Sequence, residues 1–598
     1  MSPNTKSNKQ SKKEKAVIES VYKSINKYVQ YSIIALFVFV LYGNTISHEY
    51  ALDDYMVIAD NSFTQKGIAG IHDIFAYDSF MGMGIKYVNS VEGGRYRPIS
   101  IATFAIEKQL FGQKPHISHF INLCFYALMC ILLFKLLSKL FDSYPKSHWF
   151  NTIPFIATLL FVAHPIHTEV VANIKCRDEI FALLFSLISL WYVIKYLENK
   201  KFLNLIVSAI SFAIALFSKE IAIVFIVIIP ATIYYFTSHS LKKIAISSIP
   251  LFAMVLLFLL VRHQVIAKTH LDNTNYQNIL NYSFHDMNAS QKWATIVYCL
   301  GMYVKLMLFP HPLTWDYYPY HIPKMEWSQI MVIVSLLIYI GLFYVMFKGL
   351  KSKSIISFSI LIFFVPLGLT ANIFFPIGAF MCERFLFISS IGFAIVLAWI
   401  LTQYLPKIKL KALWILCPIL CLYSFKTIDR NKAWKDGFNI IENDLKTSQN
   451  SVMSLSQYAN NIYNKAIKET DIEEQHRLYD EILKYGIRAD SICHDNQRTN
   501  FILGTVFGRY KNDYPRAISH LRKSIEIDPT FVEAYHNLGI SYAMSNQMDK
   551  AIAISLDGLK IDPNNIEIYK TLSTIYYNLG QQDKVTFYIK KVKELELK

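Results

Sequence analysis

Residues 327–347 read WSQIMVIVSLLIYIGLFYVMF, a run without a charged side chain that is long enough to cross the hydrocarbon core of a bilayer as a helix. Similar runs recur along the first 426 residues. Of the 598 residues, 53% are hydrophobic and only 17% are charged, which is too little charge to coat a soluble protein of this size. The sequence therefore predicts an all-α, polytopic transmembrane domain over residues 29–426, rather than a large soluble helical protein.

This domain is predicted to have about eleven spans, at residues 29–48, 117–140, 151–166, 178–197, 203–217, 220–237, 244–263, 327–347, 354–375, 384–404 and 410–425. The basic tail, residues 1–28, is expected in the cytoplasm, with the first span uncleaved. Residues 292–309 are also apolar, and we expect them to form a re-entrant or interfacial helix on the outer side. An odd number of spans then places the C-terminal third on the periplasmic or lumenal side.

Lysine residues support this orientation, because cytoplasmic loops of membrane proteins carry an excess of positive charge. The expected cytoplasmic loops contain Lys195, Lys200, Lys201, Lys242, Lys243, Lys348, Lys351, Lys353, Lys407, Lys409 and Lys411. The net charge of +16 therefore reflects topology, and no nucleic-acid partner is expected. The eight Cys residues show neither a C-x-x-C pair nor a zinc spacing, which argues against a disulfide or metal framework.

A 34-residue repeat begins after residue 496: Ile527-Asp528-Pro529 returns as Ile561-Asp562-Pro563, and Tyr535 returns as Tyr569. With Gly539 in the first helix and Pro after the second, this period is the signature of tetratricopeptide (TPR) repeats. We expect an α-solenoid over residues 497–598, with a third repeat beginning near Asn500, and a helical connector with degenerate repeats over 427–496. Such solenoids usually bind peptide, although a short array could merely pack on the membrane domain.

Charged and His residues gather at the outer ends of the predicted spans, including the outer loop 49–116, where such residues mark function by default. They are Asp53, Asp54, Arg95, Arg97, His164, His167, Glu169, Arg177, Asp178, Glu179, Lys219, Glu220, Asp316, Glu383 and Arg384. Because the topology rests on Lys loops alone, this shared side independently supports one outward-facing polar site. The structural alternatives are an Asp-Asp helix cap, and cations that only neutralise their neighbours, Lys219 with Glu220 and Arg384 with Glu383.

A carboxylate among cations at a membrane surface suits sugar transfer from a polyprenyl phosphate. The carboxylate can act as general base toward a hydroxyl acceptor, and the cations can hold the phosphate as it departs. The chain has no phosphate-binding G-x-x-x-x-G-K loop and no Ser nucleophile elbow, so neither ATP-driven chemistry nor Ser-dependent hydrolysis is expected.

Five stretches occur in the order found in one known family. They are Asp53-Asp54 with Ile58 and Asn61, Tyr96-Arg97-Pro98-Ile99-Ser100 with Thr103-Phe104, Ala163-His164-Pro165-Ile166-His167-Thr168-Glu169-Val170, Ser218-Lys219-Glu220, and Glu383-Arg384-Phe385-Leu386 with Ser390-Ile391-Gly392. Nearly the whole chain thereby resembles the C-type glycosyltransferases, most closely the transmembrane and TPR-repeat-containing O-mannosyltransferases and their bacterial relatives. It departs from them at Lys175-Cys176-Arg177-Asp178-Glu179, where a Gly-Arg-Ala/Ser-Asp-like run is usual, and in its shorter TPR array.

The resemblance implies transfer of a sugar, mannose by analogy, from a polyprenyl-phosphate-linked donor to a hydroxyl acceptor such as Ser/Thr of proteins bound by the TPR domain. It implies Asp53 as general base, with Asp54 as the fallback. The implied donor-phosphate contacts are Arg97, Lys219, Arg384 and Arg177, and the implied site-shaping residues are His164, His167, Glu169, Glu220 and Glu383. No cofactor is expected, and no strong ligand set supports a divalent metal.

Two other functions remain open. The enzyme could modify a lipid or envelope glycan, or the chain could be a non-enzymatic membrane scaffold organised by its TPRs. A scaffold has no need of an outward carboxylate that faces several cations, which favours an enzyme. The membrane could be the bacterial inner membrane or the endoplasmic reticulum.

Overall fold

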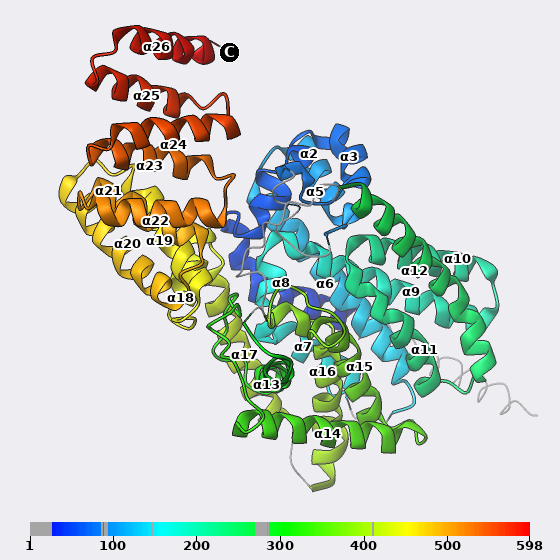
Figure 1. Cartoon of the computed structure of the whole chain (residues 1–598). Helices are drawn as coiled ribbons and strands as arrows, with labels where there is room; N and C mark the ends of the chain where they lie inside the picture. Colours follow the sequence, from blue (N-terminus) through cyan, green and yellow to red (C-terminus); the bar gives the residue numbers. More distant parts are fainter. Residues whose placement is uncertain are drawn as a thin grey trace, which may run out of the picture. The chain divides into compact units, whose positions relative to one another are not determined.

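The computed structural model describes residues 27–84, 88, 94–144, 148–269, 284, 286–408 and 412–597. Within these ranges the regular elements are all helices, which confirms the all-α prediction (Figure 1). The chain divides into two compact units. The membrane unit comprises residues up to Asn273, Met287–Trp315 and Met325–Ile440, and the C-terminal unit comprises Thr274–Asp286, Asp316–Lys324 and Ile441–Lys598. The predicted tail 1–28, except Lys27 and Tyr28, lies outside the described residues, as do Lys409 and Lys411.

Five helices are long and apolar enough to cross a membrane: Lys27–Ser47, α6 (Pro115–Leu140), Ile174–Asn199, α12 (Leu241–Thr269) and α14 (Ile330–Leu350). A sixth span results if the pair Ile153–Ala163 and Pro165–Ala172, bent by 55°, is counted as one. Four other predicted spans fall on shorter apolar helices, at Phe202–Ser218, Glu220–Phe236, Ile355–Thr370 and Ser390–Tyr404. The protein is a multi-pass membrane protein, while the number of eleven spans stays a prediction.

Two helices bear on the remaining topology. The last predicted span corresponds to α17 (Leu413–Ala433), and the predicted re-entrant segment corresponds to α13 (Ala289–Leu308). Among the described residues, neither belongs to the helices that satisfy the length and apolarity of a span. The orientation of the chain therefore remains an expectation from its Lys loops.

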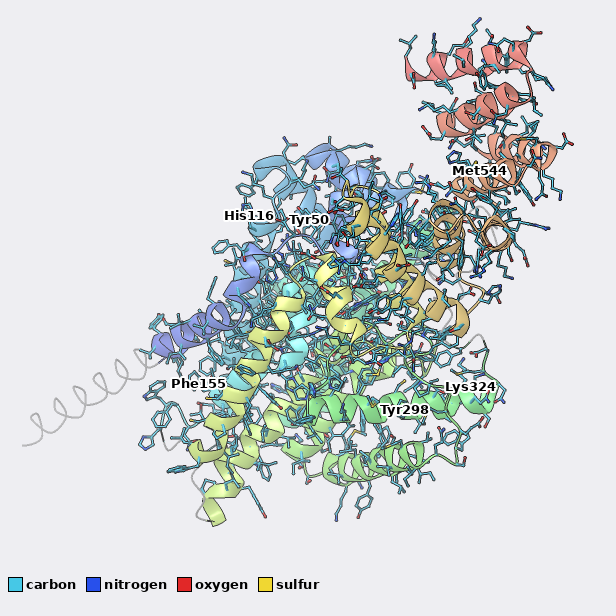
Figure 2. The ribbon with its side chains drawn as sticks, turned by 90° about the vertical axis from the view of Figure 1, so that its left-hand side faces the viewer. Tyr50, His116, Phe155, Tyr298, Lys324 and Met544 are labelled. Atoms are coloured by element: carbon cyan, nitrogen blue, oxygen red, sulfur yellow. The ribbon has the colours of Figure 1, made fainter. Side chains whose placement is uncertain are left out.

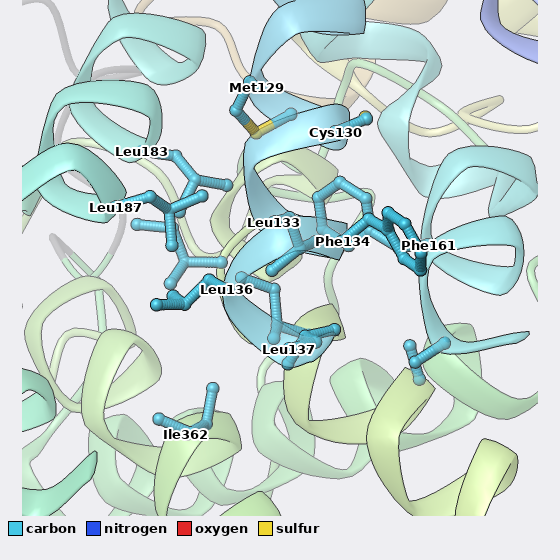
Figure 3. Packing of buried hydrophobic residues seen from close by; sticks show 14 of the residues in the cluster. Met129, Cys130, Leu133, Phe134, Leu136, Leu137, Phe161, Leu183, Leu187 and Ile362 are labelled. Atoms are coloured by element: carbon cyan, nitrogen blue, oxygen red, sulfur yellow. The ribbon is translucent and has the colours of Figure 1, made fainter. Parts of the chain in front are cut away.

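The core of the membrane unit lies between α6, α7 (Ile153–Ala163) and α9 (Arg177–Asn199). Figure 3 shows Leu133, Phe134 and Leu137 of α6 packed among Phe161 of α7 and Leu183 and Leu187 of α9. A helix buried on several sides must be apolar around most of its circumference, as α6 is. Proline at the start of α6 and α7 is compatible with the first turn, whose N–H groups have no intrahelical partner.

Residues at the starts of different helices lie at different levels along the helical bundle. Figure 2 shows Tyr50, which follows the first span, and His116, at the start of α6, at one end of the membrane unit. Phe155, near the start of α7, lies farther toward the other end. α9 begins at Arg177, so the polar run that precedes it lies directly at the end of the apolar core. α10 (Phe202–Ser218) packs between α9 and α12, so that the three helices lie side by side (Figure 1).

The C-terminal unit is a succession of antiparallel helices. Three pairs occupy the predicted repeat region: α21 (Gln497–Arg509) with α22 (Tyr514–Ile527), α23 (Val532–Met544) with α24 (Met548–Ile561), and α25 (Ile566–Asn578) with α26 (Gln582–Glu596) (Figure 1). The predicted connector contains a further pair, α19 (Val452–Ala466) with α20 (Ile472–Ile492).

Glycine in the first helix of a repeat permits close packing of the second. A Cβ atom at Gly504 would lie 2.6 Å from Leu521 Cγ, and one at Gly539 would lie 2.6 Å from Ser555 Oγ. Both distances are shorter than a van der Waals contact, so each helix pair depends on the missing side chain. Glycine at these two positions therefore lets the second helix of each pair approach closely.

Candidate active site

Charged side chains from separate helices converge on Asp178, in the first turn of α9. Its carboxylate accepts from Arg97 Nη1 at 2.8 Å and from Lys219 Nζ at 3.1 Å, and Lys175 Nζ lies 3.8 Å away. Arg97 immediately precedes α5 (Pro98–Phe111), and Lys219 connects α10 to the 3-10 turn Glu220–Val224. A carboxylate in a first helical turn is also stabilised by the unpaired N–H groups there.

Two glutamates complete this assembly, which we call the charged cluster: Asp53, Arg97, Lys175, Asp178, Glu179, Lys219 and Glu220. Glu220 accepts two bonds from Arg97, at 3.0 Å from Nε and 2.6 Å from Nη2. Glu179 lies 2.7 Å from Lys219 Nζ. Buried charges are tolerated only when they are paired. These mutual contacts therefore explain why several charged side chains can be buried together here.

The adjacent carboxylates Asp53 and Asp54 have opposite environments. The Asp54 side chain is fully buried, and it accepts backbone N–H bonds from Ala51 at 2.9 Å and from Lys175 at 2.7 Å. The Asp53 side chain is 42% exposed, and its carboxylate lies 3.4 Å from Lys175 Nζ. Asp54 therefore anchors the loop, whereas Asp53 is the carboxylate that a substrate can reach.

Their pKa values move in opposite directions. Burial would raise the pKa of Asp53, but the charges of Lys175 and Arg384 outweigh it and hold the pKa below its ordinary value. Burial raises the pKa of Asp54 to about 7, against the opposing effect of its two backbone donors. At neutral pH Asp53 is thus the ionised carboxylate, as a general base must be.

Arg384 reaches the same region from another part of the chain. It lies in the 3-10 turn Glu383–Leu386, and its Nη1 pairs with Glu169 of α8 (Thr168–Ala172). Its backbone N–H also donates to Glu169, at 3.0 Å. Among the described residues, Nη1 is the part of this guanidinium with a carboxylate partner, and the side chain is 23% exposed.

Arg177 does not join the charged cluster, although it was expected to contact the donor phosphate. Its side chain is fully buried and donates to Glu107 of α5, to Asn122 Oδ1 at 2.5 Å and to Thr103 Oγ1 at 2.9 Å. Its guanidinium also stacks 4.3 Å from the Phe104 ring centroid. This geometry corrects the expectation, because Arg177 joins α5, α6 and α9 and has no surface that a phosphate could approach.

Three residues expected to shape the site have structural partners. His164 Nε2 lies 3.0 Å from the Met307 carbonyl oxygen, and His167 lies 3.1 Å from the Tyr126 hydroxyl and 2.9 Å from the Ser390 hydroxyl. Glu383 accepts the backbone N–H of Thr314 at 2.6 Å. All three residues are buried, and each contacts a segment that is distant from Asp53 in the sequence. Glu169 and Glu220, by contrast, each hold a cation of the candidate site.

The ion pairs are not those that sequence neighbours suggest. Lys219 pairs with Asp178 and Glu179 instead of Glu220, and Arg384 pairs with Glu169 instead of Glu383. Sequence reasoning placed Asp178 and Glu179 among the outward polar residues without giving them a role, and it left Lys175 and Glu107 out. The one available signal was the departure from the family pattern at residues 175–179, which is where three of these four residues lie.

The space beside Asp178 is small. A cavity of about 20 Å³ is lined by Arg95, Arg97 and Lys175, together with Ser79 and Ser100. This volume holds about one water molecule. A sugar phosphate would not fit into this space. Within the described ranges no group of three or more His, Cys, Asp or Glu side chains is arranged to hold a metal ion.

Comparison with known proteins shows similarity to two kinds of family. A family model described as dolichyl-phosphate-mannose-protein mannosyltransferase matches residues 98–266, from α5 into α12. Tetratricopeptide-repeat models match residues 509–546 and 532–565. The chain thus combines a membrane region that is similar to this mannosyltransferase family with TPR repeats, and the predicted solenoid of TPR repeats is confirmed.

Particular relatives share this combination. Human protein O-mannosyl-transferase TMTC3 is 24% identical over 83% of this chain and 56% of its own length. The Caenorhabditis elegans protein O-mannosyl-transferase F38B6.6 is 28% identical over 68% of this chain and 56% of its own length. Human TMTC2 is 32% identical over 27% of this chain and 18% of its own length. The expected resemblance to TPR-containing O-mannosyltransferases is confirmed, and the chain spans 56% of the length of the first of these relatives.

Proposed function

We propose that this protein transfers a mannosyl residue from a polyprenyl-phosphate-linked donor to Ser/Thr hydroxyl groups of proteins. The names of its relatives support the reaction type. The observation that carries the assignment to a site is the exposed Asp53 carboxylate, which is flanked by Lys175 and electrostatically coupled to Arg384. Its buried neighbour Asp54 cannot serve in the same way without unfolding the loop.

In the proposed reaction the acceptor hydroxyl oxygen attacks the anomeric carbon of the donor sugar. Asp53 takes the hydroxyl proton as the new C–O bond forms. The bond between the anomeric carbon and the phosphate oxygen breaks, and its electron pair leaves with the lipid phosphate. A cation near that oxygen stabilises the departing charge, and an arginine can do so with two parallel N–H groups.

Exposure ranks the cations that could contact the phosphate. The side chains of Arg384, Arg97 and Lys219 are 23%, 12% and 7% exposed. Arg384 is therefore the proposed principal contact, and Arg97 the second. Arg97 and Lys219 each already lie between two carboxylates, so we propose either of them as a contact only if the cluster rearranges when the donor binds.

We further propose that the TPR repeats bind the acceptor protein and that they and the site face the periplasm or lumen. A reporter that is active only in the cytoplasm, fused after Lys598, is expected to be silent. Strong reporter activity would mean that α13 crosses the membrane and that the C-terminal unit is cytoplasmic.

The activity is tested with the purified full-length chain in lipid nanodiscs, supplied with polyprenyl-phosphate mannose and a Ser/Thr-rich acceptor protein. Intact-mass spectrometry should show added hexose units with the wild-type chain and none with Asp53→Asn. Transfer to a lipid or glycan acceptor but not to protein would contradict the proposed acceptor. Unchanged transfer in the presence of EDTA is expected for a metal-independent enzyme.

A further inference from the structure

Lys175 contacts both members of the Asp53-Asp54 pair, and it does so with different groups. Its backbone N–H donates to Asp54 Oδ1 at 2.7 Å. Its side-chain Nζ lies 3.4 Å from Asp53 Oδ2 and 3.8 Å from Asp178 Oδ2. One residue therefore joins the buried carboxylate, the exposed carboxylate and the centre of the charged cluster.

The backbone of Lys175 is held in place independently of the contacts that its side chain makes. It lies in the 3-10 turn Ile174–Cys176, where Asn173 caps the turn by accepting the Lys175 N–H at 3.1 Å. That turn leads directly into α9, whose apolar side is fixed in the core. The ammonium group consequently extends from a rigid point, with its side chain only 10% exposed.

We propose that Lys175 is the positioning residue of this site: its ammonium group orients the Asp53 carboxylate and stabilises its negative charge, while its backbone N–H fixes Asp54 as the anchor. This proposal rests on the proposed role of Asp53 as general base. It assigns the two adjacent carboxylates to different tasks, which their sequence cannot distinguish.

The charges around Asp53 make Lys175 important to it. Asp178 is the neighbouring carboxylate that disfavours a negative charge on Asp53, whereas Asp54, with its raised pKa, is protonated over the acidic range in which Asp53 titrates. Lys175 and Arg384 are the cations that act on Asp53, and Arg384 is already paired with Glu169. Among the described residues, Lys175 is also the cation that contacts the Asp53 carboxylate, at 3.4 Å. Without its charge, burial and repulsion from Asp178 would favour protonation of Asp53.

A direct contact between Lys175 and the donor phosphate is the competing role. The two roles differ in what a neutral substitution changes. Loss of a phosphate contact raises the donor KM at every pH, whereas loss of a positioning charge moves the pH at which Asp53 ionises. Since activity requires ionised Asp53, the acidic limb of kcat/KM must move to higher pH when the pKa of Asp53 rises.

The test uses Lys175→Met, which keeps the backbone N–H to Asp54 and most of the side-chain volume but removes the charge. An opposite charge at this range lowers a carboxylate pKa by at least about one unit, so the acidic limb should move up by roughly one pH unit or more. Lys175→Arg should restore the wild-type limb. Lys175→Gln provides the same comparison if Lys175→Met does not fold.

A second measurement needs no turnover. Carbodiimides react with protonated carboxyl groups, and peptide mass spectrometry of the full-length protein can follow labelling of Asp53 against pH. Labelling should extend to higher pH in Lys175→Met than in wild type. Lys139→Met is the matched control, because Lys139 pairs with Glu198 at an exposed position remote in sequence from the cluster, and it should change neither profile.

Each result decides the proposal. A labelling profile of Asp53 that is the same in Lys175→Met and wild type overturns it, as does a raised donor KM with an unmoved acidic limb. If wild type transfers no sugar while the labelling profile still moves, the proposed function fails and the effect of Lys175 on Asp53 stands.

Discussion

The two units use ion pairs in opposite ways. At the candidate site of the membrane unit the partners are distant in sequence and mostly buried: Arg97 pairs with Glu220, 123 positions away, and Arg384 pairs with Glu169, 215 positions away. In the C-terminal unit Arg477 pairs with Glu474 and Lys560 pairs with Asp557, each three positions apart on one exposed helix face.

This difference distinguishes ion pairs that form within one helix from ion pairs that depend on the tertiary structure. An exposed pair within a helix contributes about 0.3–0.5 kcal/mol, because both charges are well hydrated when apart. Breaking a buried pair by removing one partner costs about 3–5 kcal/mol, because the remaining charge is left without compensation. Ion pairs of the same residue types therefore contribute little to stability in one unit, whereas breaking them is costly in the other. In the membrane unit, buried ion pairs gather around Asp53, where the proposed reaction would use their charges.

The largest effect is expected for Asp53→Asn. Loss of the general base should lower transfer by about 10²–10⁴-fold without loss of protein yield, as measured by mannose transfer and size-exclusion chromatography. Asp54→Asn is the paired control, and it should lower thermal stability because Asp54 holds two backbone N–H groups. Full turnover by folded Asp53→Asn would move the base to Asp54.

Arg177→Met should be the most damaging structural change. It leaves Glu107 buried without its cation, at a cost of about 3–5 kcal/mol, which is visible as a lower unfolding temperature in detergent. Arg177→Met/Glu107→Leu removes both charges and should recover most of that loss. A donor contact at Arg177 would instead predict a stable single variant with a raised donor KM.

Arg384→Ala and Lys219→Ala should have intermediate effects on donor use. A charge-assisted contact contributes about 1.5–3 kcal/mol, equivalent to a rise in donor KM of roughly one to two decades. The decisive comparisons add the observed partners, as Arg384→Ala/Glu169→Gln and Lys219→Ala/Glu179→Gln. If the cation contacts the donor, the second substitution does not restore the donor KM. A return to near-normal KM would make the corresponding cation structural, and we expect this return to be more complete in the Lys219 double variant than in the Arg384 double variant.

The smallest effect is expected on the TPR surface. Lys560→Ala removes an exposed pair with Asp557 and should change the free energy of unfolding by less than about 0.5 kcal/mol. Chemical denaturation of the full-length chain, followed at the C-terminal unit by a site-specific fluorophore, measures it. A loss as large as that of Arg177→Met would invalidate the contrast between the two units.

Elements with a strong local pattern were predictable. The span predicted at residues 178–197 corresponds to α9, which runs from Arg177 to Asn199, and the 34-residue period corresponds to the helix pairs α21–α22 to α25–α26. Apolar length and repeat spacing are properties of neighbouring residues, so they can be read without knowing the fold. Lys175 was not predicted as a site residue, because its importance lies in contacts to Asp53 and Asp178 across a turn and a loop.

The sequence by itself determined that the chain is helical and that it is a membrane protein with a TPR array, and it predicted that the polar residues gather at one set of span ends. These properties depend on local composition and periodicity. Only the tertiary structure decided that Arg177 and the two His residues are buried among protein partners, that Lys219 pairs with α9, and that Asp53 is exposed while Asp54 is buried. Ion pairs between residues 41 to 215 positions apart depend on how helices pack, and adjacent carboxylates receive different environments only once the chain has folded around them.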